Sequence, residues 1–156
     1  MKTAGCLLFD NTHIDCLPDG LRGNYILFLQ LSKEQIINIG KLSGINFSRG
    51  FYAYVGSAMG GIKTRLGSHL NRGGRRHWHI DYLAEKAQIK AVIIYETEHN
   101  SECALAQALG SQFVSIQGFG ASDCRCQSHL FFDNNEERVM AGVLEAIVSL
   151  KVSTSG

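Results

Sequence analysis

The stretch YILFLQL occupies residues 25–31, and a second apolar stretch, FYAYV, occupies residues 51–55. Short apolar runs that are bounded by glycine or serine and rich in aromatic or β-branched residues are typical of buried strands. We therefore expect two strands here. If they pair antiparallel, the start of the first lies beside the end of the second, which places Tyr25 next to Tyr54.

The residues around these strands predict helices and one more strand. Ile62, Leu66 and Leu70 recur every four residues after the second strand, which indicates an amphipathic helix. We also expect short helices at 34–39 and 79–87, a strand at 91–95, a helix from an N-cap at Ser101 to about 113, and a last helix capped by Asn134 with Val139, Val143 and Ile147 on its core face. The predicted class is α/β (α+β), with a small three-stranded mixed or antiparallel sheet flanked by helices.

Length and composition predict one domain spanning residues 1–156. With 156 residues, 45% of them hydrophobic, the chain can bury one core. No run approaches the roughly 20 apolar residues of a membrane helix, and the N-terminus lacks the layout of a cleavable signal. The five cysteines are therefore expected to be reduced thiols or metal ligands in the cytoplasm. We expect no membrane partner.

Charge is distributed unevenly along the chain. No acidic residue lies between Glu34 and Asp81, whereas that segment holds seven basic residues: Lys41, Arg49, Lys63, Arg65, Arg72, Arg75 and Arg76. The rest of the chain has a net charge of −6, although the whole chain carries only +1. A basic flank of this kind favours a polyanionic partner. The alternative is a solvated face that acidic residues from elsewhere in the fold neutralise.

Two phenols and a guanidinium are expected to converge at one edge of the sheet. The helix that follows Gly56 starts beside Tyr25 and Tyr54, and Arg65 lies one turn into it. Arginine offers a planar fork of donors that matches phosphate oxygens. His69, four residues later, shares that helix face and is a candidate proton carrier or phosphate contact. The alternatives are tyrosines that only pack at the rim and a histidine that is bonded locally.

These residues resemble the motifs of the GIY-YIG nuclease superfamily. The motif pair is Gly23-Asn24-Tyr25 and Tyr54-Val55-Gly56, followed by IKTRLGSHL at 62–70. The superfamily core spans about residues 23–107, with an extension at about 108–156. The stretches GFYAYVGSAMGGIKTRL, RRHWHIDYL and FGASDCRCQSHLFF look like those of the small stand-alone Uri-type endonucleases.

The resemblance implies a metal-dependent endonuclease that hydrolyses phosphodiester bonds, with DNA as the expected partner and a role in DNA repair or processing. In that superfamily two tyrosines, a helix arginine and a later glutamate surround one metal ion, Mg²⁺ or Mn²⁺. Tyr25, Tyr54 and Arg65 match, with Tyr25 expected to orient or deprotonate the water. Glu102 is the acidic candidate for the metal, and Gln107, Asp81 and Asp123 are the other residues considered. The nucleic-acid contacts are expected from Lys63, Arg72, Arg75, Arg76, His77 and His79.

Three rival interpretations remain open. GSAMGGIKT at 56–64 is similar to a phosphate-binding P-loop, but one extra residue before Lys63 displaces the lysine. Cys124, Cys126 and His129 form a C-x-C-x-x-H cluster that Cys103, or His77 and His79, could complete as a zinc site, although packing roles are favoured. The third alternative is a nucleic-acid binder without activity.

Overall fold

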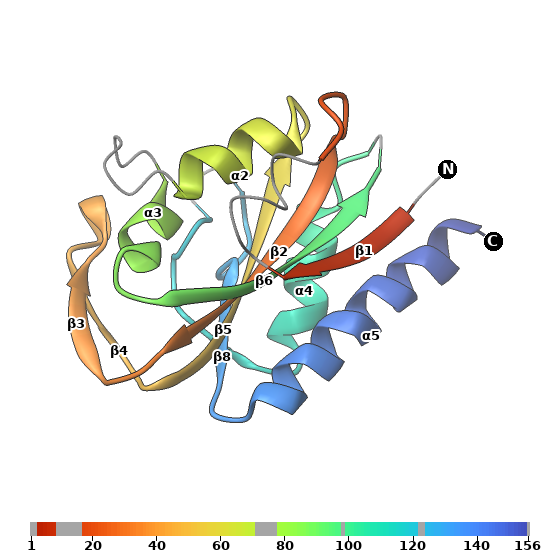
Figure 1. Cartoon of the computed structure of the whole chain (residues 1–156). Coiled ribbons are helices and arrows are strands. Elements are labelled where there is room, and N and C mark those ends of the chain that lie inside the picture. Colours follow the sequence, from red (N-terminus) through yellow and green to blue (C-terminus); the bar gives the residue numbers. More distant parts are fainter. Residues whose placement is uncertain (1–2, 9–16, 71–77, 98, 122–123, 156) are drawn as a thin grey trace.

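An antiparallel sheet of six strands forms the centre of the computed structural model, which describes residues 3–8, 17–70, 78–97, 99–121 and 124–155 (Figure 1). Each neighbouring pair of strands runs antiparallel. In spatial order the strands are β1 (Thr3–Leu8), β6 (Gln88–Glu96), β2 (Gly23–Leu31), β5 (Gly50–Ala58), β8 (Leu130–Asp133) and β7 (Val114–Ser115).

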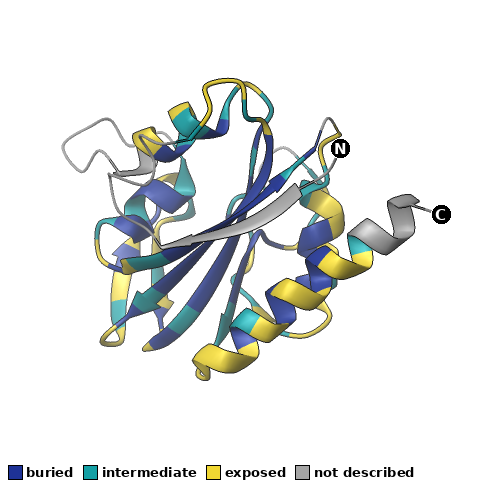
Figure 2. Cartoon of the chain, turned by 45° about the vertical axis from the view of Figure 1, so that its right-hand side comes forward, coloured by how far each residue is buried: buried dark blue, intermediate teal, exposed yellow. Residues whose placement is uncertain are grey.

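Helices cover both faces of this sheet. On one side lie α2 (Ile62–Leu70), α3 (His79–Ala84) and a separate hairpin made of β3 (Gln35–Asn38), the 3₁₀ turn η1 (Gly40–Leu42) and β4 (Gly44–Phe47). On the other side lie α4 (Glu102–Gly110) and α5 (Glu136–Ser155). Figure 2 shows that α5 turns its buried residues toward the sheet and an exposed stripe outward.

Alternation along the central strands divides the apolar side chains into two cores. Tyr25, Leu27 and Leu29 of β2 face α2 and α3, whereas Ile26 and Phe28 face α4 and α5. All five are at most 2% exposed. A strand that is buried on both faces has no polar side to alternate with, which explains why its sequence is a nearly continuous apolar run. The two candidate tyrosines, Tyr25 and Tyr54, belong to the core under α2 and α3.

The expected fold class is confirmed, and the sheet is larger than the three strands that we predicted. The strands predicted at 25–31, 51–55 and 91–95 correspond to β2, β5 and β6. Strands β1, β7 and β8 were not among the strands predicted from the sequence. Two of these have only two and four residues, too few to show a period of their own.

The helix predicted at 34–39 is wrong, because these residues form strand β3. Gln35 pairs with Phe47 and Asn38 pairs with Gly44 across the hairpin. Burial alternates along β3, with Ile36 73% exposed and Ile37 5% exposed. Two adjacent β-branched residues favour extended backbone, and the partner strand, which the sequence analysis did not identify, supplies the hydrogen bonds.

The two predicted helix caps differ in detail from the prediction. Ser101 precedes α4, but its side chain makes no capping bond, and Asn100 Oδ1 instead accepts from the Glu102 amide at 3.0 Å. At α5 the cap is Asn135 in place of Asn134, with its Oδ1 accepting from the Arg138 amide at 3.1 Å. Neighbouring polar residues can exchange this role, so sequence alone locates a cap to within about one residue.

Among the described residues, no helix has the length and apolar character needed to cross a membrane.

Candidate functional site

The two motif glycines and tyrosines form one local structure. Tyr25 pairs with Gly56 across β2 and β5, and a Cβ on Gly56 would collide with the Tyr25 ring. Glycine is therefore required there for the ring to occupy this position against the neighbouring strand. Tyr54, two residues earlier on the same face, has its ring centroid 6.4 Å from that of Tyr25. The predicted approach of the two tyrosines is thus observed.

A cavity of about 690 Å³ opens at this end of the sheet. Its wall includes a tyrosine, three ionisable side chains, a tryptophan and two cysteines: Tyr54, Arg65, His79, Glu102, Trp78, Cys103 and Cys124. These residues come from β5, from the starts of α2, α3 and α4, and from the loop before β8. Tyr25 is not on the wall. It is fully buried behind the cavity.

Three groups hold the Arg65 guanidinium in place. Its Nη1 donates to the Ser57 carbonyl at 2.9 Å, and its carbon lies 4.3 Å from the centre of the Trp78 ring. Arg65 also hydrogen-bonds the Tyr25 hydroxyl. A guanidinium fixed in this way loses little side-chain entropy when it meets an anion. The cavity therefore presents a preorganised positive charge.

Burial determines the protonation of both tyrosines. Desolvation raises the pKa of Tyr25 well above its usual value, and the opposing attraction of Arg65 does not cancel that effect. The pKa of Tyr54 is raised for the same reason, with a further contribution from Tyr25. Both side chains are therefore neutral phenols at neutral pH, and the phenolate considered from the sequence is disfavoured in the protein without ligand.

Glu102 stands in the first turn of α4 and reaches the cavity wall. Its Oε1 lies 3.2 Å from Nδ1 of His129. Burial lowers the pKa of His129, so the imidazole is neutral and this contact is a hydrogen bond in which Nδ1–H donates to the carboxylate. The negative charge of Glu102 also acts on both tyrosines, because it raises the pKa of Tyr25 and of Tyr54.

Asn24 is a positioning residue that the sequence analysis did not single out. It is fully buried, and its side-chain amide donates to the Gly56 carbonyl at 3.3 Å and to Asn100 Oδ1 at 3.0 Å. Its Oδ1 accepts from the Ser101 amide at 2.8 Å. These bonds tie β2 to the start of α4 and hence to Glu102. A polar residue within a buried apolar strand was the available sequence signal.

His79 lines the cavity as a neutral imidazole. Its Nδ1 accepts a hydrogen bond from the Gly120 amide at 2.8 Å, which places the ring hydrogen on Nε2. Its ring packs edge-on against Phe119 at 5.6 Å, and burial lowers its pKa. His79 was predicted to contact nucleic acid, and its place on the wall is compatible with that role.

The other candidates are placed differently or lie outside the described residues. Lys63 makes an exposed ion pair with Asp19 at 3.2 Å. Asp81 accepts from the Trp78 amide at 2.9 Å, and Gln107 is exposed on α4 away from the cavity wall. The side chain of His69 is outside the described part of the chain, as are all of Arg72, Arg75, Arg76, His77 and Asp123.

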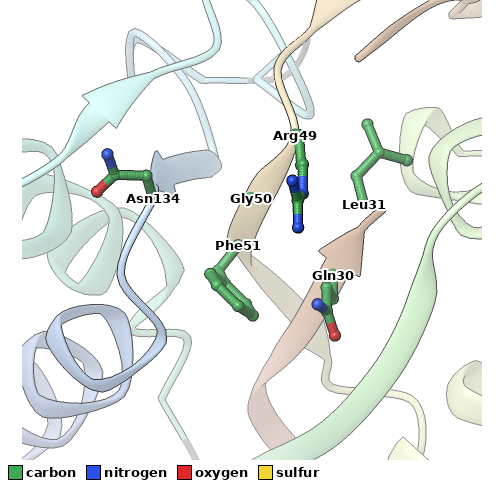
Figure 3. A pocket seen from close by; sticks show the side chains of 6 residues that line it. All are labelled: Gln30, Leu31, Arg49, Gly50, Phe51 and Asn134. Carbon is green, nitrogen blue, oxygen red and sulfur yellow. The ribbon is translucent and has the colours of Figure 1, made fainter. Parts of the chain in front are cut away.

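A second cavity lies at the opposite end of β5. Figure 3 shows Arg49, Phe51 and Asn134 around it, and its volume is about 280 Å³. Tyr54, on the wall of the larger cavity, is five residues further along the strand than Arg49, a distance of about 17 Å. The basic segment predicted from the sequence therefore does not gather all its charges at one place.

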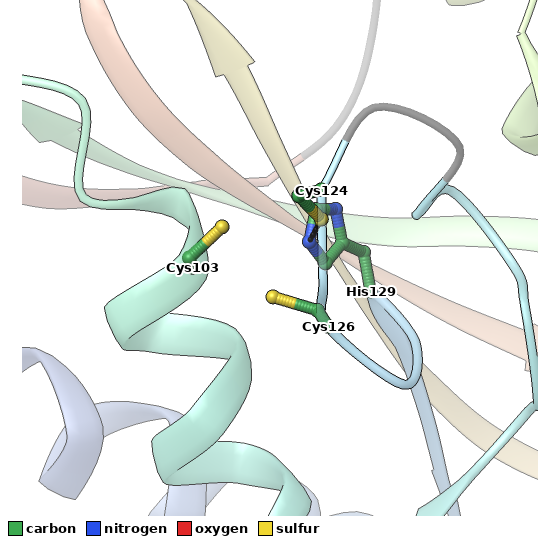
Figure 4. A group of neighbouring side chains, drawn as sticks. All are labelled: Cys103, Cys124, Cys126 and His129. Atoms are coloured by element: carbon green, nitrogen blue, oxygen red, sulfur yellow. Dashed lines mark hydrogen bonds between the residues drawn. The ribbon is translucent and has the colours of Figure 1, made fainter.

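Four potential metal ligands meet beside the larger cavity. Cys103, Cys124, Cys126 and His129 each offer one ligand atom, and these atoms lie within 4.8 Å of one another (Figure 4). Burial is the main reason that the pKa of Cys126 is raised to about 12. This group could hold a metal ion, and its sulfur and nitrogen atoms suit a zinc-like ion better than Mg²⁺.

Comparison with known proteins identifies a family. No curated protein and no solved structure matches the chain. The model of a family described as "Domain of unknown function DUF123" matches residues 24–152, which includes the tyrosines, Arg65, Glu102 and the Cys/His group. The chain therefore belongs to the DUF123 family.

Proposed function

We propose that this protein is a metal-dependent endonuclease that hydrolyses phosphodiester bonds of nucleic acid, with DNA as its substrate and repair or processing as its role. The observation that carries the proposal is the meeting of Tyr54, Arg65 and Glu102 on one cavity wall. The resemblance of the two tyrosine motifs and of the helix after them to the GIY-YIG superfamily supports it independently.

Arg65 would stabilise the transition state. Attack on phosphorus adds negative charge to the non-bridging oxygens, and a fixed guanidinium aimed at that position stabilises the charge without reorganising. Ser57, Trp78 and Tyr25 hold Arg65 in advance of binding. Tyr25 would therefore act as a positioning residue behind Arg65.

Tyr54 is the phenol that can reach the reacting groups, because it lies on the cavity wall. As a neutral hydroxyl it can accept a hydrogen bond from the attacking water and donate one to a phosphate oxygen. His79, neutral and on the same wall, offers its Nε2 hydrogen to the substrate. The water thus needs a proton acceptor other than a tyrosine phenolate, and a phosphate oxygen of the substrate meets that need.

Glu102 would hold the divalent cation. Mg²⁺ is bound in proteins through one or two carboxylates, with water and substrate phosphates completing its shell. A carboxylate on the wall of an open cavity that a fixed arginine also lines fits that requirement. When bound, Mg²⁺ or Mn²⁺ supplies polarisation of the phosphate and support for the leaving oxygen.

We also propose that the protein works in the cytoplasm. There the thiols of Cys103, Cys124 and Cys126, which form no disulfide, stay reduced.

The test is cleavage of labelled single-stranded, duplex and branched DNA with and without Mg²⁺ or Mn²⁺. The wild type should cut only with metal, and Glu102→Gln should keep binding but lose at least about 10²-fold in cleavage rate, the scale of losing one electrostatic stabiliser. Glu137→Gln is the matched control, because Glu137 occupies the first turn of α5 and is exposed. Binding without cleavage by the wild type on every substrate would leave only a nucleic-acid binder.

A further inference from the structure

The Cys/His group joins two segments that are distant in the sequence. Cys103 belongs to the first turn of α4, whereas Cys124, Cys126 and His129 come from the loop that leads into β8. In Figure 4 the three sulfur atoms and the imidazole turn toward one common space. None of the three thiols is in a disulfide, so all are available as ligands.

The spacing of these atoms is close to that of a four-coordinate zinc site. Zinc–sulfur bonds of about 2.3 Å in a tetrahedron place neighbouring sulfur atoms about 3.8 Å apart. The ligand atoms here lie within 4.8 Å of one another, and His129 Nε2 is 3.4 Å from Cys124 Sγ. Changes in side-chain torsion that move the ligand atoms by about 1 Å would therefore bring them to the separations of a zinc site.

The imidazole of His129 is already oriented as a metal ligand. An ionised carboxylate can only accept, so the contact of Glu102 Oε1 with Nδ1 at 3.2 Å places the ring hydrogen on Nδ1. The lone pair of Nε2 then faces the thiols. A carboxylate behind the second nitrogen is the usual support of a zinc-binding histidine, because it sets the tautomer and raises the basicity of the ligand.

We propose that Cys103, Cys124, Cys126 and Nε2 of His129 bind one Zn²⁺ in a closed structural site, with Glu102 as the carboxylate behind His129. The three thiols lose their protons to solvent on binding, and no other atom is transferred. Four protein ligands leave no open position for water, which separates this site from any catalytic cation. The zinc would fasten the loop at 124–129 to α4.

Zinc at this site would also affect the wall of the larger cavity. Cys103 and Cys124 line it beside Glu102, so zinc would fix this part of the wall and the direction of the Glu102 carboxylate. Zinc binding does not depend on the nuclease proposal. A protein that fails to cut DNA would still bind zinc, and the two proposals are tested by separate measurements.

The experiment measures metal content and ligand field on the full chain. Wild-type protein purified under reducing conditions should contain one zinc per chain by elemental analysis. Replacement by Co²⁺ should give thiolate charge-transfer bands and the visible bands of tetrahedral cobalt. Cys103→Ser, Cys124→Ser and Cys126→Ser should each lose the zinc or change the cobalt spectrum. Arg125→Ser is the matched control in the same loop, exposed between two ligands, and should retain both signals.

A second measurement separates the carboxylate from the ligands and does not depend on the folding of a cysteine variant. Glu102→Gln should still bind zinc, with affinity reduced about 10- to 100-fold in competition with a chelator. Zinc added to metal-free wild type should raise its unfolding temperature. Reduced wild type that binds no zinc would overturn the proposal. So would a cobalt spectrum that Cys103→Ser leaves unchanged, because the site would then lack its fourth ligand.

Discussion

Gly56 shows how one residue sets the geometry of the candidate site. The Tyr25 ring lies against its α-carbon, and Tyr25 is fully buried. We expect Gly56→Ala to destabilise the fold by about 1–3 kcal/mol, the usual range for overpacking a core. Gly60→Ala is the control, because a Cβ there meets open space. Urea unfolding of the two variants measures the difference, and equal stabilities would show that the ring can move.

The partly buried imidazole of His79 should make the stability of the fold depend on pH. Its pKa is lowered by burial, so between that value and the unfolded value of about 6.5 the unfolded chain binds more protons than the folded one. Stability is therefore fully present above pH about 6.5 and decreases as the pH falls through this window. Protonation would also remove the acceptor for the Gly120 amide.

The corresponding experiment compares wild type with His79→Gln by thermal unfolding. We expect the variant to lose less stability than the wild type between pH about 7.5 and 5.5, because it lacks the titrating group. The slope with pH is the measurement, so a constant offset in stability does not affect the result. Identical slopes would mean that His79 titrates normally in the folded protein.

Alanine substitutions at two helical glycines should change the stability of the protein in opposite directions. In α2, Gly67 is exposed and a Cβ would meet nothing, so Gly67→Ala should stabilise by about 1 kcal/mol through helix propensity. In α5, a Cβ on Gly142 would collide with the Phe113 ring, which follows α4. Gly142→Ala should therefore destabilise the protein, because overpacking outweighs the gain in propensity. Chemical denaturation measures both, and stabilisation by both would contradict close contact between α5 and residue 113.

The β3–β4 hairpin shows the limit of local patterns at the same scale. A short helix ending before Gly40 is predicted at residues 34–39, yet Gln35–Asn38 is a strand. Its partner lies only a few residues further on, at Gly44–Phe47, and Ile37 and Phe47 pack into the core beneath α3. Pairing and burial decided the structure, as they do when a segment is too short to carry a clear period.

The charge of the whole molecule leads to a prediction about salt. If nucleic acid binds the basic residues at 72–76, the logarithm of its affinity should fall linearly with the logarithm of the salt concentration. Replacing Arg72, Arg75 and Arg76 by glutamine should reduce the slope by about 2–3 if each contacts one phosphate. Arg49→Gln is the control, since Arg49 lies at the far end of β5. Fluorescence anisotropy over a salt series measures the slopes, and an unchanged slope in the triple variant would remove that segment from the interface.

The amino-acid sequence by itself determined the central strands and the site residues that follow from them. The apolar runs of β2, β5 and β6 are long enough to be recognised, and antiparallel pairing of the first two brings Tyr25 to Tyr54. Arg65 follows within the next helix, so chain connectivity places it beside them. Each strand and helix is encoded by its own short run of residues, where periodicity and motif spacing carry the information, and pairing of the two strands then brings the site residues together.

The tertiary structure alone decided the remaining wall of the cavity. Asn24 reaches Ser101, Glu102 meets His129, and Cys103 approaches Cys124 only because α4 and the loop before β8 pack at the same end of the sheet. No local pattern encodes these contacts, since each joins segments whose separation depends on how two faces of the sheet are covered. A hydrogen bond or a metal ligand set requires agreement within about an ångström, and packing of the whole chain provides it.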